Sequence, residues 1–363
     1  MKSYDLSGSM VRRRGRSTSK SLAKFAVAAL IFTLLPWAMP GANAASLTSR
    51  MFDLSAPAVE RIKDKPLHNG TVMQSFAFDN VNRHIYAIQL MAGGQQLPGE
   101  AAPVSGSARD AAGDLVLTRL DSTGSELGHM VLKGFGHGVQ IGVETVGAKA
   151  YLWTETDAVT EGSSGWGTQI ARFPFENGKV LTPASPELRK FRLVEGADRT
   201  TVNIDEANGL LTMRYRLNGS FRFGVYDLES VKRGEYTPLA DVPQPMVGTF
   251  QGFASYGDYL YLLEGNSYGS PGSSPPAGNT YLTAVDLNTG AVKDKQLVSA
   301  GSSMTFREPE GLAISFGNPC KPGKAELNIG FASDFTPKRL ANIFYLDRLL
   351  PEAALVKGHV PYK

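Results

Sequence analysis

Short apolar or alternating segments, separated by Gly, Asn, Asp and Pro, dominate the chain after residue 60. Runs of about 4–8 residues with this character are typical of β-strands, and almost no segment shows the 3.6-residue period of an amphipathic helix. Clear examples are His84–Leu90, Tyr151–Glu155, Gly209–Tyr215 and Tyr259–Glu264. The pattern, with turn sequences such as Asn288-Thr289-Gly290 between the runs, predicts an all-β protein.

One strand pair recurs five times, at intervals of about sixty residues. Each copy begins with a polar residue before an apolar strand, and these first residues are Gln74, Gln140, Asn203, Gln251 and Glu310. Two further strands complete most copies; we expect Gln169–Phe175, for example, to pair with Lys179–Leu181. Five units of about four strands predict a five-bladed β-propeller, in which neighbouring blades cover each other's faces. A pair of β-sandwiches is the alternative, but sandwiches need no fivefold repeat.

Three segments lie outside the repeat. Residues 45–69 are expected to form an N-terminal arm that completes the last blade, and residues 70–363 to form a single propeller domain. Residues 92–112 and 266–279 contain mostly small and polar side chains. Such segments bury little apolar surface, so we expect mobile surface loops that shape the binding face.

Residues 1–44 have the organisation of a secretory signal peptide. The basic stretch Arg12–Lys24 precedes the apolar segment Phe25–Leu35, and Ala42-Asn43-Ala44 matches an A-x-A cleavage site. The apolar segment is too short to span a bilayer, which disfavours an uncleaved anchor. We therefore expect export by Sec to a secreted or cell-wall-associated location, with the twin-arginine route as an alternative because of the arginine run.

Charge and cysteine content narrow the partners. The whole chain has a formal net charge of +3, but the signal segment contains seven Lys or Arg side chains and one acidic one, so its removal leaves a net charge near −3. Nucleic acids and anionic membranes need a clustered basic surface, so neither partner is expected. The single cysteine, Cys320, excludes an intrachain disulfide. No apolar run of transmembrane length follows the signal, and we expect a monomer.

The first residues of the five repeats are the first candidate site. The first strand of each propeller blade lines the central axis, so these side chains should meet at one mouth of the channel. Four are amides, which donate and accept hydrogen bonds and suit sugars or polyols but not acid–base catalysis. Glu310 is then one member of a set rather than the private partner of Glu308. Ordinary solvation of the channel by water is the alternative explanation.

His137 is a further candidate, because Gly136 and Gly138 beside it allow a ligand to approach the backbone closely. It can serve as a general base, a metal ligand or a hydrogen-bond donor, and a purely structural role is the alternative. A metal site would also need carboxylates to converge, from the set Glu144, Glu155, Asp205 and Glu206. No cofactor is expected, although a divalent cation such as Ca²⁺ stays open, and familiar hydrolase and nucleotide-binding signatures are absent.

The two tryptophans beyond the signal segment have different settings. Trp166 is surrounded by Gly and Ser, which is typical of an exposed ring that can stack on a sugar face. Trp153 lies in the alternating strand Tyr151–Glu155, so we expect it in the core.

At these residues the chain resembles a known family. The strings QSFAFD, GHGVQIGVE, GWGTQIARFPF, QGFASYGDYLYLLEG and EPEGLAI are similar to the β-propeller of teichoic acid biosynthesis protein C. The same propeller occurs in receptor-binding proteins of phages that recognise wall teichoic acid, and helveticin-type bacteriocins are more distantly similar. The resemblance covers about residues 70–346, with a weak match in the third blade at Asn203 and Asp205. The positions that match recurrent motifs are Gln74, His137, Gln140, Trp166, Gln251, Glu308 and Glu310.

The resemblance implies a five-bladed propeller that handles cell-wall glycopolymers of Gram-positive bacteria, and it provides no defined catalytic set. The preferred hypothesis is a secreted protein that binds a teichoic-acid-like polymer or another surface carbohydrate at the channel mouth. A second hypothesis is a hydrolase or lyase of such a polymer, with Glu310 or Glu308 as acid or base and His137 assisting. A third is a bacteriocin-like interaction protein without a small ligand.

Overall fold

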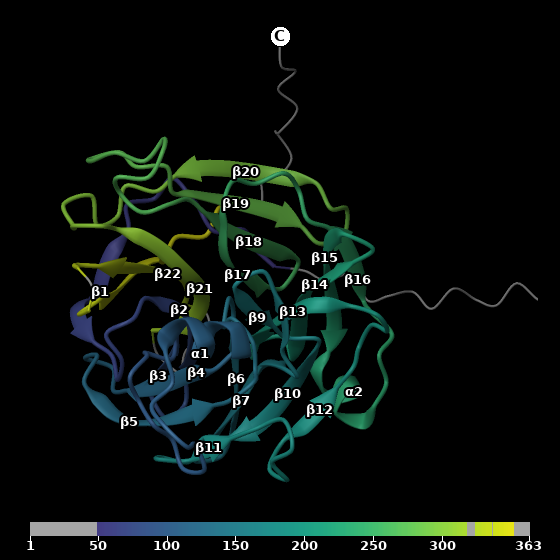
Figure 1. The fold of residues 1–363 in the computed structure, drawn as a ribbon. Coiled ribbons are helices and arrows are strands. Elements are labelled where there is room, and N and C mark those ends of the chain that lie inside the picture. Colours follow the sequence, from purple (N-terminus) through teal and green to yellow (C-terminus); the bar gives the residue numbers. More distant parts are fainter. Residues whose placement is uncertain (1–48, 318–323, 336, 352–363) are drawn as a thin grey trace, which may run out of the picture. The chain divides into compact units, whose positions relative to one another are not determined.

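The computed structural model describes residues 49–317, 324–335 and 337–351. Within these residues, five sheets surround a common axis, each with its first long strand innermost (Figure 1). The predicted five-bladed β-propeller is therefore confirmed, with four or five strands in each blade. The predicted signal peptide at residues 1–44 and the single cysteine, Cys320, lie outside the described residues.

The blades follow one another along the chain. From its inner edge outward, blade 1 contains β2 (Met73–Asp79), β3 (His84–Leu90), β4 (Leu115–Leu120), β5 (Glu126–Leu132) and β11 (Val180–Leu181). Blade 2, in the same direction, contains β6 (Gly142–Val146), β7 (Lys149–Thr156), β10 (Gln169–Pro174) and β12 (Arg189–Phe191). Blade 3 contains β13 (Asp198–Asp205), β14 (Leu210–Leu217), β15 (Ser220–Asp227) and β16 (Ala240–Pro243).

The last two blades complete the ring. Blade 4 contains β17 (Phe250–Tyr256), β18 (Tyr259–Glu264), β19 (Tyr281–Asp286) and β20 (Val292–Leu297). Blade 5 contains β21 (Glu308–Phe316), β22 (Ala325–Ser333), β23 (Leu340–Leu346) and β1 (Val59–Pro66). The remaining elements are α1 (Gly106–Ala112), α2 (Leu228–Arg233) and the small hairpin of β8 (Val159–Glu161) and β9 (Ser164–Trp166).

Strand β1 closes the ring, because it pairs antiparallel with β23 although it precedes every other strand of the propeller. The expectation that the N-terminal arm completes the last blade is thus confirmed for this strand. Upstream of β1, Phe52 is completely buried, and its backbone N–H donates to the Tyr261 hydroxyl at 3.0 Å. The arm is therefore part of the fold and is held on two blades.

The apolar core lies between blades rather than inside one sheet. Five clusters of buried side chains each draw residues from two neighbouring blades. Phe76 of blade 1 packs with Ile343 of blade 5, for example, and Phe253 of blade 4 packs with Phe223 of blade 3. Trp153 is fully buried between blades 2 and 3, as predicted, and it stacks on Phe191.

Two local predictions were wrong. Lys179–Leu181 does not pair with Gln169–Phe175: β11 leaves blade 2 and runs parallel to β5 of blade 1, while β12 takes the outer place beside β10. The second concerns residues 92–112, expected as a mobile loop. This segment contains α1, which the buried Arg109 holds in place through ion pairs with Glu100 and Asp114. The ion pairs of Arg109 therefore hold α1 in place, a role that buried apolar side chains usually have.

Neither helix is long, and in the part of the chain that the structure describes no helix has the length and apolar character needed to cross a membrane.

Candidate functional site

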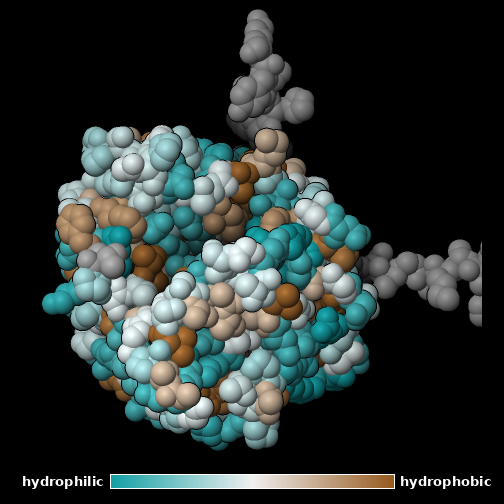
Figure 2. Space-filling model, in the orientation of Figure 1, coloured by the Kyte–Doolittle hydropathy of each residue, from teal (hydrophilic) through white to brown (hydrophobic). Residues whose placement is uncertain are grey.

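A pocket of about 760 Å³ lies where three inner strands begin. Its walls come from β2, β17 and β21, from the chain before β2, from residues 90–93, from α1 and from Pro337 and Arg339. In Figure 1, α1 lies in front of the inner strands, and Figure 2 shows the surface from the same side. That surface is mixed, with apolar residues scattered among hydrophilic ones. The pocket contains five of the predicted site residues: Gln74, His137, Gln251, Glu308 and Glu310.

A β-bulge at the start of each of the three strands directs side chains into the pocket. The pairing register shifts between Met73 and Ser75 in β2, between Phe250 and Gly252 in β17, and between Pro309 and Leu312 in β21. The residues at these irregularities are Gln74, Gln251 and the segment with Glu310. Bulges turn a side chain out of the regular alternation, so the same device presents all three polar groups to one space.

The pocket has a closed floor one residue deeper along the same strands. A methyl group on Gly252 would lie 2.7 Å from the Gly311 Cα atom, and one on Gly311 would lie 2.7 Å from the Ser75 Cα atom. Gly311 also has φ of +78°, a conformation that favours glycine. Strand β17 therefore touches β21, and β21 touches β2, backbone to backbone at this level.

Gln140 helps to close the floor instead of lining the pocket. Its side chain is fully buried; the amide nitrogen donates to the Leu312 carbonyl at 2.8 Å, and the amide oxygen accepts from the Phe253 N–H at 3.3 Å. Asn203 is also buried, and its oxygen accepts from the Ser255 N–H at 3.1 Å. The structure thus separates the predicted set: three members face the pocket, while these two amides join inner strands to one another.

Glu308 and Glu310 bring two carboxyl groups to the same pocket. Burial raises the pKa of Glu308, and the nearby Arg339 partly opposes this shift. Burial, together with the negative charge of Glu308, raises the pKa of Glu310 well above its ordinary value. Glu310 is 5% exposed, so it has little water to stabilise an anion. The protonated form of Glu310 is therefore favoured, which makes its carboxyl group a hydrogen-bond donor as well as an acceptor.

The chain before Glu308 is held rigidly. Arg307 is fully buried, and its guanidinium donates to the carbonyls of Val298 and Ala300 at 2.7 and 2.9 Å. Phe306 and Arg307 both have positive φ, at +64° and +42°. Non-glycine residues adopt this conformation at a cost and cluster at functional sites, where the surroundings impose it. The two residues thus fix the direction from which the carboxyl pair enters the pocket.

His137 and Asp110 lie next to each other in the pocket lining. The His137 Nδ1 and Asp110 Oδ1 atoms are 3.6 Å apart, and neither has a hydrogen-bond partner among the described residues. Burial lowers the pKa of His137, and Arg199 lowers it further, against the opposing effect of Asp110. The neutral form of the imidazole is therefore favoured, and its Nδ1 atom is buried beside Asp110.

Trp166 does not line the pocket but supports His137. Its ring stacks on the His137 imidazole with centroids 4.6 Å apart, and the Arg199 guanidinium lies 4.1 Å from its centroid. Trp166 is half-buried, so its exposed context in the sequence did not reveal these two contacts. A sugar ring that stacked on Trp166 would have to displace His137 or Arg199, or bind beside them.

Glu155 organises this wall, a role that its sequence context did not reveal. Its carboxylate is buried and accepts from the backbone N–H groups of His137, Gly138 and Gly167, at 2.9, 2.6 and 2.7 Å. Burial raises the pKa of Glu155 to about 7, in spite of these three donors. A methyl group on Gly136 would lie 2.0 Å from the carboxylate, so Gly136 makes room for Glu155, whereas Gly138 faces Ile88.

The other acidic residues considered as metal ligands do not converge. The Glu144 carboxylate is bound by Trp153, Arg172 and Lys232. Asp205 ends β13, at the opposite end of the inner strands from the pocket, and Glu206 follows it in the turn. The pocket therefore offers two amides, a neutral imidazole, one guanidinium and three carboxyl groups, of which Glu308 and Glu310 have raised pKa values and the third is Asp110. This set suits hydroxyl groups, which both donate and accept hydrogen bonds.

Comparison with known proteins agrees with this architecture. Residues 72–345 match the family described as phage 5-bladed beta propeller receptor binding platform domain. The chain is 28% identical, over 294 residues, to the putative major teichoic acid biosynthesis protein C of Bacillus subtilis (strain 168). That match covers 78% of this chain and 60% of the relative, so the chain spans less than two thirds of the relative's length.

A solved structure shares the fold. The tail fiber of Staphylococcus aureus phage P68 superposes with a TM-score of 0.59 at 21% sequence identity, over 83% of this chain and 56% of the fiber. The predicted resemblance to teichoic acid biosynthesis protein C and to phage receptor-binding propellers is confirmed. The family match extends over most of the chain and includes all five blades' inner strands, and the chain therefore belongs to the family of phage five-bladed β-propeller receptor-binding platform domains.

Proposed function

We propose that this chain is an exported binding protein that holds a hydroxyl-rich cell-wall glycopolymer, of the teichoic-acid type, in the pocket at the start of β2, β17 and β21. The observation that carries the proposal is the repeated bulge, which directs Gln74, Gln251 and Glu310 into one space of about 760 Å³. A pocket of this volume accommodates one or two units of a polyol or sugar chain.

The chemistry of the walls suits such a ligand. Each amide offers a donor and an acceptor to hydroxyl groups, and a protonated Glu310 adds a donor without adding charge. Arg339 lies in the lining and provides one positive charge for a phosphodiester. Membership of a receptor-binding family and the relative's name, which mentions teichoic acid, support the same class of ligand.

The first experiment incubates the purified protein with Gram-positive cell walls and with isolated teichoic acid, with and without EDTA. Retention on the polymer and release of soluble fragments are both measured. Binding predicts retention without release. It also predicts that Gln251→Ala and Trp166→Ala each weaken retention by about tenfold or more. The first variant removes an amide from the pocket, and the second removes the ring that stacks on His137. Gln296→Ala on β20, outside the pocket, is the matched control and should retain the polymer like the wild type. No retention on either material would overturn the proposal.

A second candidate function is cleavage of the same polymer by a hydrolase or lyase reaction, because Glu308 and Glu310 are two carboxyl groups of raised pKa in one pocket. This function predicts released fragments, and it predicts that Glu310→Gln abolishes release while retention persists. Under pure binding, Glu310→Gln changes retention less than tenfold, because the amide keeps a donor and an acceptor in the same place.

A further inference from the structure

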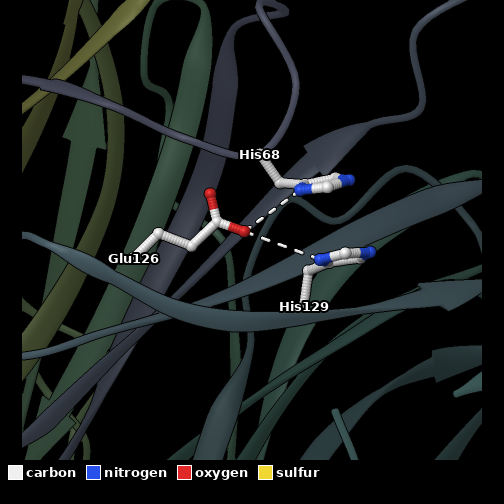
Figure 3. Close-up of side chains that lie close together, drawn as sticks. All are labelled: His68, Glu126 and His129. Carbon is white, nitrogen blue, oxygen red and sulfur yellow. Dashed lines mark hydrogen bonds and ion pairs between the residues drawn. The ribbon is translucent and has the colours of Figure 1, made fainter. Parts of the chain in front are cut away.

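Two histidines and a glutamate form a cluster on blade 1, outside the pocket. His68 lies in the connection between β1 and β2, while Glu126 and His129 belong to β5 (Figure 3). Their side chains are 31%, 35% and 32% exposed, so solvent and ions reach all three. None of them lines the pocket, and the proposed polymer binding makes no use of them.

The ligating atoms of this cluster converge. The two imidazole rings are stacked, with centroids 3.3 Å apart and planes inclined by 17°. Both Nδ1 atoms face the same carboxylate oxygen of Glu126, at 3.0 Å from His68 and 3.5 Å from His129 (Figure 3). One explanation is that this oxygen accepts a hydrogen bond from an N–H group of each ring. The alternative is that the two Nδ1 atoms and the carboxylate are placed to bind a common ion.

The ligating atoms lie about as close together as those around a metal ion. Metal–ligand bonds of about 2.0–2.2 Å place the donor atoms of a tetrahedral zinc site about 3.3–3.6 Å apart. The separation of 3.5 Å between His129 and Glu126 lies in this range, whereas the hydrogen bond of 3.0 Å between His68 and Glu126 would lengthen slightly on metal binding. All the ligating atoms lie within 4.8 Å of one another. We propose that His68, Glu126 and His129 form a binding site for a divalent transition-metal ion of the Zn²⁺ class, with water in the fourth position.

A bulge creates this arrangement in the strand. Glu126 and His129 are three residues apart, so in a regular strand their side chains would point to opposite faces of the sheet. Leu120 pairs with Glu126 while its neighbour Arg119 pairs with Gly128, so one extra residue, Leu127, is inserted in β5. The insertion restores Glu126 and His129 to the same face.

Backbone contacts hold the ligands before any metal arrives. The His129 N–H donates to the Asn177 side chain at 2.9 Å, and the His68 N–H donates to the Thr118 hydroxyl at 3.3 Å.

The donor set also selects the type of ion. Two imidazole nitrogens and one carboxylate suit Zn²⁺, Co²⁺ or Ni²⁺, whereas Ca²⁺ prefers six to eight oxygens. The site would tie the connection that leaves β1, the outer strand of blade 5, to β5 of blade 1. A bound ion would therefore fasten the place where the ring of blades closes.

Titration of the metal-free protein, without an affinity tag, with Zn²⁺ and with Co²⁺ tests the proposal. Calorimetry gives the stoichiometry and Kd, visible absorption of Co²⁺ reports tetrahedral coordination, and thermal unfolding reports the linkage of binding to stability. We expect saturable binding at this site, the intense visible bands of tetrahedral Co²⁺, and a Zn²⁺-dependent rise in Tm. Ca²⁺ should give none of these effects.

Variants assign the signal to the cluster. His129→Ala and Glu126→Gln should each weaken Zn²⁺ binding by about 10–100-fold or more, because each removes a direct ligand. Each variant should also abolish the Zn²⁺-dependent rise in Tm. His84→Ala, at another histidine of blade 1, is the matched control and should bind like the wild type. Circular dichroism checks that every variant is folded, and two separate variants guard against one that is not. Absence of saturable binding in the wild type, or binding unchanged in both cluster variants, would refute the site. Polymer retention is measured separately, so its failure and the failure of the metal site are distinguishable.

Discussion

At the scale of single residues, the pocket depends on groups whose burial changes their chemistry. Glu310 illustrates this, because its sequence context gives only a carboxylate at a turn, while its surroundings raise its pKa well above 4.5. The carboxyl group is then most useful as a neutral donor, and its ionisation opposes folding.

Replacing Glu310 by Gln should change how stability depends on pH. An acid whose pKa is raised by folding binds more protons in the folded state, so the wild-type free energy of unfolding falls as pH rises above about 4.5 towards the raised pKa. Gln carries no such dependence, so the free energy of unfolding of Glu310→Gln, relative to that of the wild type, should increase steadily as the pH rises from about 4.5 to 8. Urea unfolding between pH 4 and 9 measures the difference. Glu195→Gln, at a side chain that is 89% exposed, is the control, and identical pH profiles for wild type and Glu310→Gln would contradict the prediction.

Gly311 allows a second test at this scale. Gly311 and Gly219 both have φ of +78°, but a methyl group on Gly311 would lie 2.7 Å from the Ser75 Cα atom, whereas one on Gly219 meets nothing within 4 Å. Gly219→Ala should therefore cost only the conformational term of about 1–2 kcal/mol. Gly311→Ala adds the clash between inner strands and should lower Tm clearly more. Equal losses of stability would show that the strands separate easily at the axis.

At the scale of elements, a buried ion-pair network fixes α1 over the pocket. Arg109 is 1% exposed, and its guanidinium donates to Glu100 at 2.6 Å and to Asp114 at 2.8 Å. The hydrogen bond with Glu100 is the largest cause of the raised pKa of Arg109, so it stays charged throughout the physiological range. This network, and not an apolar face, positions Asp110 beside His137.

Arg109→Ala should loosen α1 and weaken the pocket. Removing Arg109 leaves the buried Asp114 without its cation, while Glu100 keeps its ion pair with Lys133. Loss of one partner of a buried ion pair typically costs about 3–5 kcal/mol, and the retained pair with Lys133 reduces the cost here. Thermal unfolding measures this loss, and hydrogen exchange of the α1 amides locates it. Arg233→Ala on α2 removes the exposed pair with Glu235 and a hydrogen bond to the Ser230 hydroxyl, and it should lower stability clearly less. If the two variants were equally stable, the network would not be what holds α1.

The element scale also shows what the sequence could and could not predict. The repeat was visible because every blade needs an apolar inner strand after a polar first residue, and this identified Gln74, Gln251 and Glu310 correctly as neighbours. It could not separate them from Gln140, because only the bulges decide whether an amide faces the pocket or joins two strands. The role of Glu155 was missed since its partners are backbone N–H groups, which leave no sequence signal. The cluster of His68, Glu126 and His129 was missed because strict alternation places Glu126 and His129 on opposite faces of a strand, and the one-residue bulge that brings them together is not visible in the sequence.

At the scale of the whole molecule, the ring depends on β1, the first strand among the described residues. Removing residues before Leu67 deletes β1 and exposes the edge of β23 and the cluster around Ile62 and Ile343. We expect this shortened protein to aggregate or to lose cooperative unfolding, since an exposed strand edge pairs readily with other chains. A protein that starts at Ser49 keeps every described contact of β1 and should behave as a monomer in the same gel-filtration and calorimetry measurements. Cooperative unfolding of the shorter form would contradict the need for β1.

The pairing of β1 with β23 joins residues almost three hundred positions apart, as the partnership of Val59 and Tyr345 shows. During synthesis, β1 therefore has no partner until residues 340–346 of β23 have been made. Contacts of such large sequence separation form late and slow the final assembly. A nascent molecule is thus an open arc with one vacant edge until its last blade emerges, and this interval is when a chaperone or a second unfinished copy would compete for β1.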